Sequence, residues 1–128
     1  MINKRFTFPK KERLSWKRHI DQLFMEGRSF VTFPLQVIYL PVKKEMPVPV
    51  SVLVSVSKKR FKRAVKRNRV KRQIREAYRI HKHELADALI ERKSHLLVAF
   101  LYLSNMLPPF SEVEKAMVKA LHTLCDKE

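Results

Sequence analysis

The feature that most constrains this chain is an internal block of basic residues that also carries an apolar stripe. Residues 57–82 contain 13 Lys or Arg and 1 Glu, with no Gly or Pro. Within the block, Val70, Ile74, Ala77 and Tyr78 recur at the spacing of one helical face. A disordered basic tail would lack this stripe and would not lie between apolar segments. The block therefore predicts a helix with one buried face and one basic face.

The distribution of charge indicates a polyanionic partner. The 128-residue chain has 28 Lys or Arg against 12 Asp or Glu, a formal net charge of +16, and most of this excess lies in residues 57–82. Charge that serves only solubility is spread over a surface rather than concentrated in one segment. A concentrated positive excess favours a nucleic acid as the binding partner.

The remaining composition argues against export or membrane insertion. The longest apolar run, residues 96–103, is far shorter than the roughly 20 residues that a membrane helix needs. No apolar signal-peptide core follows the basic N-terminus, and the single cysteine, Cys125, cannot form an internal disulfide. We therefore expect a soluble, reduced and cytoplasmic protein with no membrane partner.

Apolar patterns on both sides of the basic block predict the rest of the fold. Helices are expected at residues 14–26, 57–82 and 111–124, and strands at residues 35–40, 50–56 and 96–103. Residues 84–92 fit either a short separate helix or a continuation of the helix before them. Gly27 follows the first apolar stripe and is expected to form a left-handed helix cap. This order predicts an α+β fold, a small two-layer sandwich with one layer of helices on a mixed sheet. We expect a single domain over residues 1–128, in which residues 1–9 are flexible.

Helical geometry divides the basic block into two parts. Phe61, Ala64 and Val65 fall on a different side from the buried stripe and predict a turn that packs against the sheet before the helix. The side opposite the stripe carries a polar row, Asn68, Arg72, Arg75 and Arg79, flanked by Arg69, Lys71 and Lys82. This row is about 16 Å long, and its guanidinium groups suit bidentate contact with phosphates. We expect it to bind nucleic acid.

The sequence offers little for a catalytic or metal site. His81 and His83 are two residues apart and do not share a helical face, and no cysteine or carboxylate cluster completes a metal-binding set. No Ser-His-Asp arrangement or glycine-rich phosphate loop is present, and Cys125 fits a small core residue better than a nucleophile. We expect no catalytic side chain, no metal bound by the protein alone, and no small-molecule substrate.

Residues 58–76 resemble the signature of the bacterial ribonuclease P protein subunit. The resemblance rests on Arg67-Asn68-Arg69, followed by Lys71-Arg72 and Arg75-Glu76. Residues 55–59 resemble the strand-to-helix connection of that family, and residues 6–8, 11–14 and 23–27 fall at its spacing. A match over this many positions is more specific than a short isolated motif.

The resemblance implies a fold and a function. The fold is an αβββαβα arrangement with a left-handed crossover around the basic helix, contrary to the usual handedness. This arrangement has four strands, whereas the apolar patterns predict three, so one short strand is not accounted for by those patterns. Proteins of this family support a catalytic RNA that removes the 5′ leader from precursor tRNA. The RNA subunit and its Mg²⁺ ions perform the hydrolysis, so the chain would be an enzyme subunit without a catalytic side chain of its own.

The resemblance and the basic block together imply two RNA-contacting regions. The residues expected to bind the catalytic RNA are Lys58, Lys59, Arg60, Arg63, Lys66, Arg67, Asn68, Arg69, Lys71, Arg72, Arg75 and Arg79. The residues expected to border a cleft for the leader of precursor tRNA, between the first helix and the sheet, are Phe8, Arg13, Trp16, Lys17, Ile20 and Phe24.

Other functions remain open from the residues alone. A ribosomal or general RNA-binding protein of similar small fold would bind RNA without a role in tRNA processing. A nucleoid DNA-binding protein would prefer duplex DNA, but the sequence has neither a dimer seam nor a groove-inserting arm. A protein-only nuclease would need an acidic metal site, and the basic block holds only Glu76.

Overall fold

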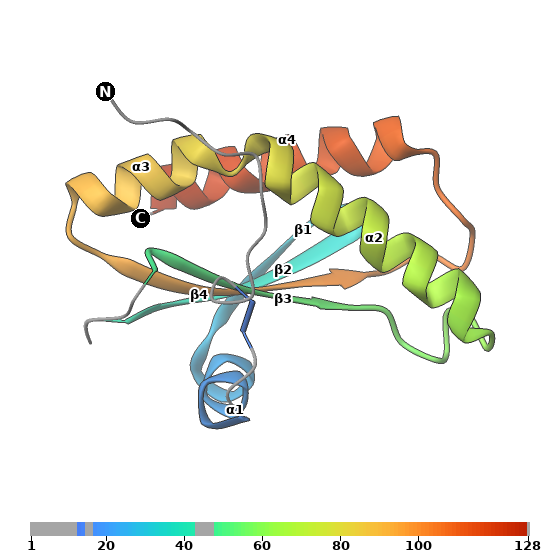
Figure 1. Cartoon of the computed structure of the whole chain (residues 1–128). Helices are drawn as coiled ribbons and strands as arrows, with labels where there is room; N and C mark the ends of the chain where they lie inside the picture. The colour runs from blue at the N-terminus through green and yellow to red at the C-terminus, as the bar shows by residue number, and fades with distance from the viewer. Residues whose placement is uncertain (1–12, 15–16, 43–47, 128) are drawn as a thin grey trace.

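The structure, a computed structural model, describes residues 13–14, 17–42 and 48–127 and contains a four-stranded sheet with helices on both faces (Figure 1). The helices are α1 (Lys17–Glu26), α2 (Ala64–His81), α3 (His83–Glu91) and α4 (Phe110–Lys127). The strands are β1 (Arg28–Thr32), β2 (Leu35–Val42), β3 (Val50–Ser55) and β4 (His95–Tyr102). Within the part of the chain that the structure describes, no helix has the length and apolar character needed to cross a bilayer.

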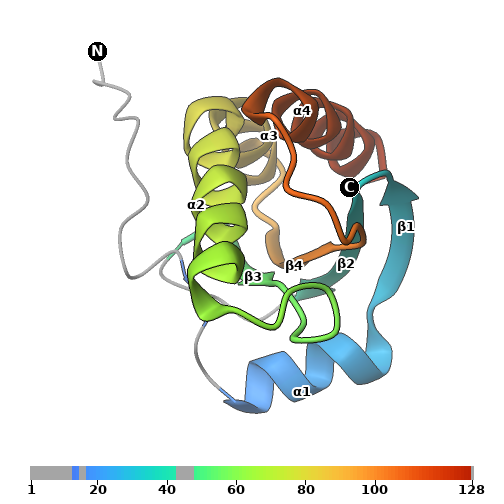
Figure 2. The same ribbon diagram turned by 90° about the vertical axis from the view of Figure 1, so that its right-hand side faces the viewer.

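The sheet is mixed and has the strand order β1-β2-β4-β3. β2 pairs antiparallel with both β1 and β4, whereas β3 runs parallel to β4 at the edge of the sheet. Because β3 and β4 are parallel neighbours, the chain must cross over between them, and α2 and α3 form this crossover. Figures 1 and 2 show that the crossover is left-handed. The α+β class, the mixed sheet and the left-handed crossover are therefore confirmed, with α3 as a short addition to the αβββαβα order.

The helices form two layers of unequal size. α2, α3 and α4 lie together on one face of the sheet, and α1 lies alone on the opposite face (Figures 1 and 2). The predicted single layer of helices thus describes three of the four, and α1 adds a second layer. An amphipathic stripe shows that a helix packs on something, but it does not show which face of a sheet the helix covers.

β4 is the centre of the core because both of its faces are covered. Val98 and Phe100 lie in the larger hydrophobic cluster with α2, α3 and α4, while Leu97 and Ala99 pack with Leu23 of α1. All five side chains are fully buried. This explains the unbroken apolar run in the sequence, which is typical of a strand that is buried on both sides.

Strand β1 is the short strand that the sequence did not reveal. It pairs with β2 over its whole length, from Arg28 opposite Tyr39 to Thr32 opposite Leu35. Its side chains are exposed or only half-buried, and Val31 is exposed. Because the strand lacks a buried face, its residues do not alternate between apolar and polar as a half-buried strand would.

Gly27 does not have the left-handed conformation that its position after α1 suggested, so that prediction is wrong: its φ is not positive. The residue is needed for close packing instead. A Cβ atom at this position would collide with the carbonyl oxygen of Leu23 and would lie 3.0 Å from Cγ2 of Ile38. With any other residue at position 27, the end of α1 could not approach β2 this closely.

The basic block folds largely as expected. The predicted stripe on α2 is buried against the sheet and α4, and Phe61 is buried before the helix begins, with its ring 6.1 Å from that of Tyr102. Ala64 and Val65 are exceptions, because both are exposed rather than packed in the preceding turn. The helix already begins at Ala64, which turns Val65 toward the same side as Arg72.

Candidate nucleic-acid interface

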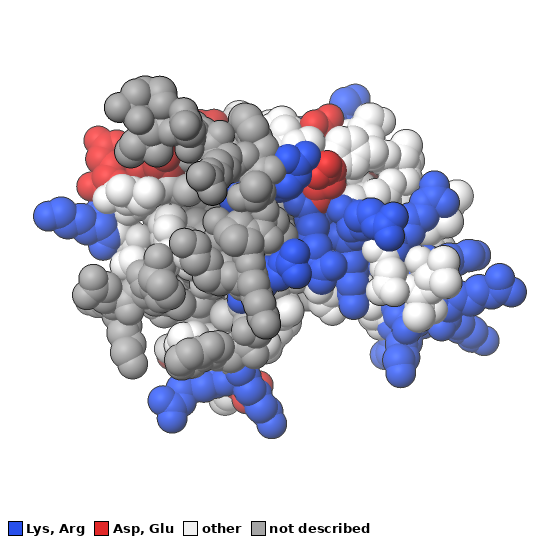
Figure 3. Space-filling view, in the orientation of Figure 1, with Lys and Arg blue, Asp and Glu red and all other residues white. Residues whose placement is uncertain are grey.

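In the described part of the chain, the densest group of basic residues lies on α2 and the segment before it. Figure 3 shows the largest group of Lys and Arg side chains over α2 and the segment before it, with a few acidic side chains at its upper margin, and a second group of Asp and Glu side chains near α3. α3 carries Glu84, Asp87 and Glu91. The separation of the two signs leaves a surface on α2 that favours a polyanion.

The outer surface of α2 holds the residues predicted to bind nucleic acid. Asn68, Arg69 and Arg72 are exposed, and Arg75 is half-buried farther along the same helix. We refer to these four residues as the α2 face. The α2 face presents guanidinium forks that can bind phosphate oxygens in pairs, together with an amide that can both donate and accept.

Arg75 links the α2 face to the segment before α1. Burial, and to a lesser extent the cation of Arg13, lower the pKa of Arg75 from its ordinary value. Arg13 itself pairs with Val52 at the outer edge of β3, which places it between α1 and α2. The positive surface therefore continues from α2 across the sheet edge toward the first helix.

Arg79 differs from the other predicted members of the row because a carboxylate of the same helix neutralises it. Its Nε and Nη2 atoms donate to the two carboxylate oxygens of Glu76, at 2.6 and 2.8 Å. The hydrogen bonds from Arg79 hold the pKa of the Glu76 carboxyl below its ordinary value. An RNA phosphate would have to compete with Glu76 for this guanidinium.

Arg67 stabilises the loop that precedes α2. Its Nη1 atom donates to the carbonyl oxygens of Phe61 and Lys62, at 2.9 and 2.8 Å. Because a guanidinium carries five N–H groups, this contact leaves donors for an RNA ligand. The resemblance implied only an RNA-binding role for Arg67, and a sequence pattern could not reveal the backbone contact.

We expect Arg67→Ala to destabilise the fold by about 1 kcal/mol, the typical net value of a hydrogen bond that is partly buried. Arg69→Ala removes the same charge from an exposed position and should change the free energy of unfolding by no more than about 0.5 kcal/mol. Urea unfolding of the two variants measures the difference. Equal midpoints would show that Arg67 does not stabilise the loop.

The other predicted RNA-binding residues lie around the N-terminal end of α2. Lys58, Lys59, Arg63 and Lys66 are exposed, whereas Arg60 and Lys71 are half-buried. Lys82, expected to flank the row, is buried instead, because α2 ends at His81 and the chain turns there into α3. That prediction is wrong, since the helical geometry does not extend past the turn.

The residues predicted to border a leader cleft are only partly described. Phe8 and Trp16 lie outside the described residues, as do residues 1–9, which were expected to be flexible. Arg13 and Lys17 are exposed, Ile20 is half-buried against the sheet, and Phe24 is 45% exposed on α1. On the face of the sheet that α1 covers, four apolar side chains of β2 and β3 are only partly buried: Ile38, Leu40, Val42 and Leu53. α1 and the sheet thus present a partly open apolar surface beside the exposed cations.

The histidines and the cysteine have contacts that suit structural roles. Nε2 of His81 lies 2.9 Å from a carboxylate oxygen of Glu114, which joins α2 to α4. Burial raises the pKa of the Cys125 thiol, which disfavours the reactive thiolate. Among the residues that the structure describes, no group of three or more His, Cys, Asp or Glu side chains could hold a metal ion.

Comparison with known proteins identifies relatives over most of the chain. The sequence profile of the Ribonuclease P family matches residues 8–125. A ribonuclease P protein component from Porphyromonas gingivalis is 50% identical over 116 residues, which cover 91% of this chain and 85% of the relative. That of Chlorobaculum tepidum is 39% identical over 103 residues, which cover 75% of this chain and 67% of the relative.

Solved structures of RNase P proteins have the same fold. The Staphylococcus aureus protein superposes with a TM-score of 0.70 at 19% identity, covering 88% of this chain and 94% of that one. The Thermotoga maritima protein gives a TM-score of 0.69 at 20% identity, covering 88% and 96%.

Proposed function

Because the chain belongs to the ribonuclease P protein component family and is thus part of an endoribonuclease with an RNA partner, we propose that its α2 face binds the catalytic RNA subunit. The observation that carries this proposal is that three residues of the α2 face, Asn68, Arg69 and Arg72, are exposed on a helix whose opposite side is buried. The helix fixes the spacing of their backbone positions before RNA binds, so binding has to order only the side chains and not the backbone that carries them. The family assignment favours this function over a ribosomal or general RNA-binding role.

We assign the hydrolysis of the phosphodiester bond to the RNA subunit and to the Mg²⁺ ions held by its phosphates. The contribution of the protein is positive charge at fixed positions. Cations of the α2 face reduce the repulsion between RNA phosphates and displace the monovalent counterions that surround them. The RNA can then adopt its active fold and bind Mg²⁺ at a lower concentration of the metal.

We further propose that the surface between α1 and the sheet binds the 5′ leader of precursor tRNA. The support is chemical: a half-exposed aromatic ring on α1 and partly covered apolar side chains of the sheet lie beside Arg13 and Lys17. A single strand needs a surface on which bases stack and cations that follow its backbone. Arg13, beside Val52 at the edge of β3, also helps to lower the pKa of Arg75 on the α2 face, so the leader and the RNA subunit would bind to neighbouring cations.

Phe24→Ala tests the leader proposal. We expect the holoenzyme with this variant to bind precursor tRNA about fivefold to tenfold more weakly, because stacking of a base on an aromatic ring contributes about 1–3 kcal/mol. Binding of mature tRNA, which lacks the leader, should not change. Competition binding with the two tRNAs measures the difference.

Met25→Ala is the matched control, since Met25 is the next residue of α1 and is 86% exposed. It should leave both affinities unchanged. An equal loss for tRNA with and without the leader in Phe24→Ala would place Phe24 outside the leader site, whereas the role of the α2 face would be unaffected.

A further inference from the structure

We propose that a groove between the loop before α2 and the loop after β4 binds one unpaired nucleotide of RNA, with the phosphate on its cations and the base against Met106 and Leu107. This inference rests on the proposed function, because it assumes that the chain binds RNA. It adds residues 105–107, which lie outside both the signature in residues 58–76 and the α2 face, to the cations at the start of that signature.

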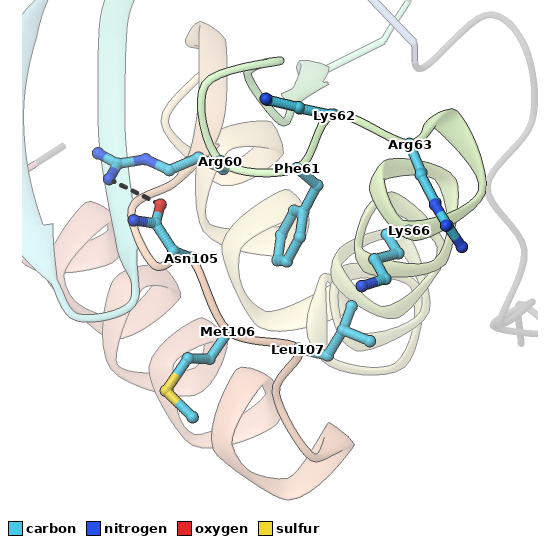
Figure 4. A pocket seen from close by; sticks show the side chains of 8 residues that line it. All are labelled: Arg60, Phe61, Lys62, Arg63, Lys66, Asn105, Met106 and Leu107. Atoms are coloured by element: carbon cyan, nitrogen blue, oxygen red, sulfur yellow. Dashed lines mark hydrogen bonds between the residues drawn. The ribbon is translucent and has the colours of Figure 1, made fainter.

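The groove has a volume of about 490 Å³ and is built from two segments that are far apart in the sequence. Residues 60–63 and Lys66 line one side, and residues 105–107 line the other (Figure 4). Nη1 of Arg60 donates to Oδ1 of Asn105 at 3.3 Å and joins the two sides. In Figure 4, Arg60 and Asn105 lie at one end of the groove, Lys66 and Leu107 lie at the other, and Phe61 lies between them.

The charge of the groove favours an anionic ligand. Its lining includes Arg60, Lys62, Arg63 and Lys66, and among the described residues no carboxylate lies within salt-bridge distance of these cations. The first turn of α2 has no acidic residue either. Cations at the N-terminal end of a helix oppose the helix dipole and repel one another, which costs folding free energy. A bound phosphate would relieve both effects, as expected of a binding site that departs from local stability rules.

The apolar side of the groove distinguishes a nucleotide from a bare phosphate. Met106 is 76% exposed and Leu107 is 36% exposed, and both line the groove, at whose rim the Met106 side chain points away from Phe61 (Figure 4). A phosphate or the backbone of a duplex would gain nothing from these side chains. The face of an unpaired base can pack against them, and the amide of Asn105 can hydrogen-bond to a base edge.

Hydrogen bonds hold both sides of the groove in place before a ligand binds. The Tyr102 hydroxyl donates to the carbonyl oxygen of Met106 at 2.6 Å, and Nε2 of Gln73 donates to that of Pro108 at 3.0 Å. On the other side, Arg67 holds the carbonyls of Phe61 and Lys62. A groove that is already ordered loses little conformational entropy on binding.

Methionine methyl NMR on the full-length protein tests the inference. We would label the methionine methyl groups with ¹³C and titrate the protein with a single-stranded RNA of about eight nucleotides. The Met106 resonance should shift, while Met25, exposed on α1, and Met117, buried in the core, serve as internal references. An RNA duplex and a glutamate-rich peptide of matched charge should leave the Met106 resonance in place.

Affinities of two variants complete the test. Met106→Ala and Asn105→Ala should each weaken binding of the single strand about threefold to tenfold, corresponding to up to about 1.4 kcal/mol, and should leave duplex binding unchanged. Single-strand binding without a Met106 shift would overturn the inference and leave the proposed function intact. An equal shift with the duplex or the peptide would overturn it too, by showing that the groove attracts any anion. Failure to bind any RNA would overturn the proposed function itself.

Discussion

Replacing Arg69 and Arg72 together with Ala is expected to weaken binding of the ribonuclease P RNA by about 100-fold at low salt. Both side chains are exposed on the α2 face. A hydrogen bond to a charged group contributes about 1.5–3 kcal/mol, and each 1.4 kcal/mol is a tenfold change in affinity. The loss of two phosphate contacts should also reduce the slope of log affinity against log salt by about 2. Filter binding or fluorescence anisotropy over a series of salt concentrations measures both quantities.

The matched control is Lys115→Ala with Lys119→Ala on α4. These lysines are exposed, and the double variant loses the same amount of charge on a different helix. Its affinity and salt slope should remain close to those of the wild type. If both double variants lose affinity equally, the RNA responds to net charge and the α2 face has no special role.

Phe100→Ala should destabilise the fold strongly, by about 3–5 kcal/mol. Phe100 is fully buried on β4, and its ring centroid lies 6.0 Å from that of Tyr78 on α2. Removing the ring leaves a cavity between the central strand and the helix that carries the α2 face. Since a domain of this size is stable by only about 5–15 kcal/mol, much of the protein would unfold at moderate urea concentrations.

Phe33→Ala provides the same chemical change at an exposed position, next to β1. It should destabilise the fold by less than about 1 kcal/mol. Urea unfolding followed by circular dichroism compares the two variants. Similar midpoints would contradict the assignment of Phe100 to the centre of the core.

Saturating ribonuclease P RNA should partly restore Phe100→Ala. A ligand that binds only the folded protein stabilises it by about 2.7 kcal/mol at a concentration of 100 times its Kd. The Arg69→Ala, Arg72→Ala double variant should gain much less at the same RNA concentration, because its Kd is higher.

The core of the fold could be predicted from the sequence because its patterns are strong. The stripe on α2 and the apolar run of β4 are both buried, as predicted, because each contains enough apolar residues for its pattern to show which side chains enter the core. β1 could not be found in this way, because Val31 and its neighbours are exposed and leave no alternation. The sequence singles out Gly27 at the end of α1 but suggests a left-handed cap. Its actual role, a close approach between the helix end and β2, depends on the tertiary structure.

The candidate site was predictable only where it follows a single helix. Asn68, Arg69 and Arg72 share one exposed side of α2, as their spacing indicates. The contact between Arg60 and Asn105 joins residues 45 positions apart, and no local pattern signals it. The pairing of Arg79 with Glu76 and the burial of Lys82 likewise depend on neighbours that a count of charges does not identify.

Cleavage of precursor tRNA by the ribonuclease P RNA of the same organism, at a low Mg²⁺ concentration, tests the role of the α2 face most directly. The reaction would be run without protein, with the wild type, with the Arg69→Ala, Arg72→Ala variant, and with the Lys115→Ala, Lys119→Ala control. We expect strong stimulation by the wild type and by the control. The α2 variant should give little stimulation at the same protein concentration. Full stimulation by the α2 variant, or none by the wild type, would contradict the proposal that the α2 face binds and supports the catalytic RNA.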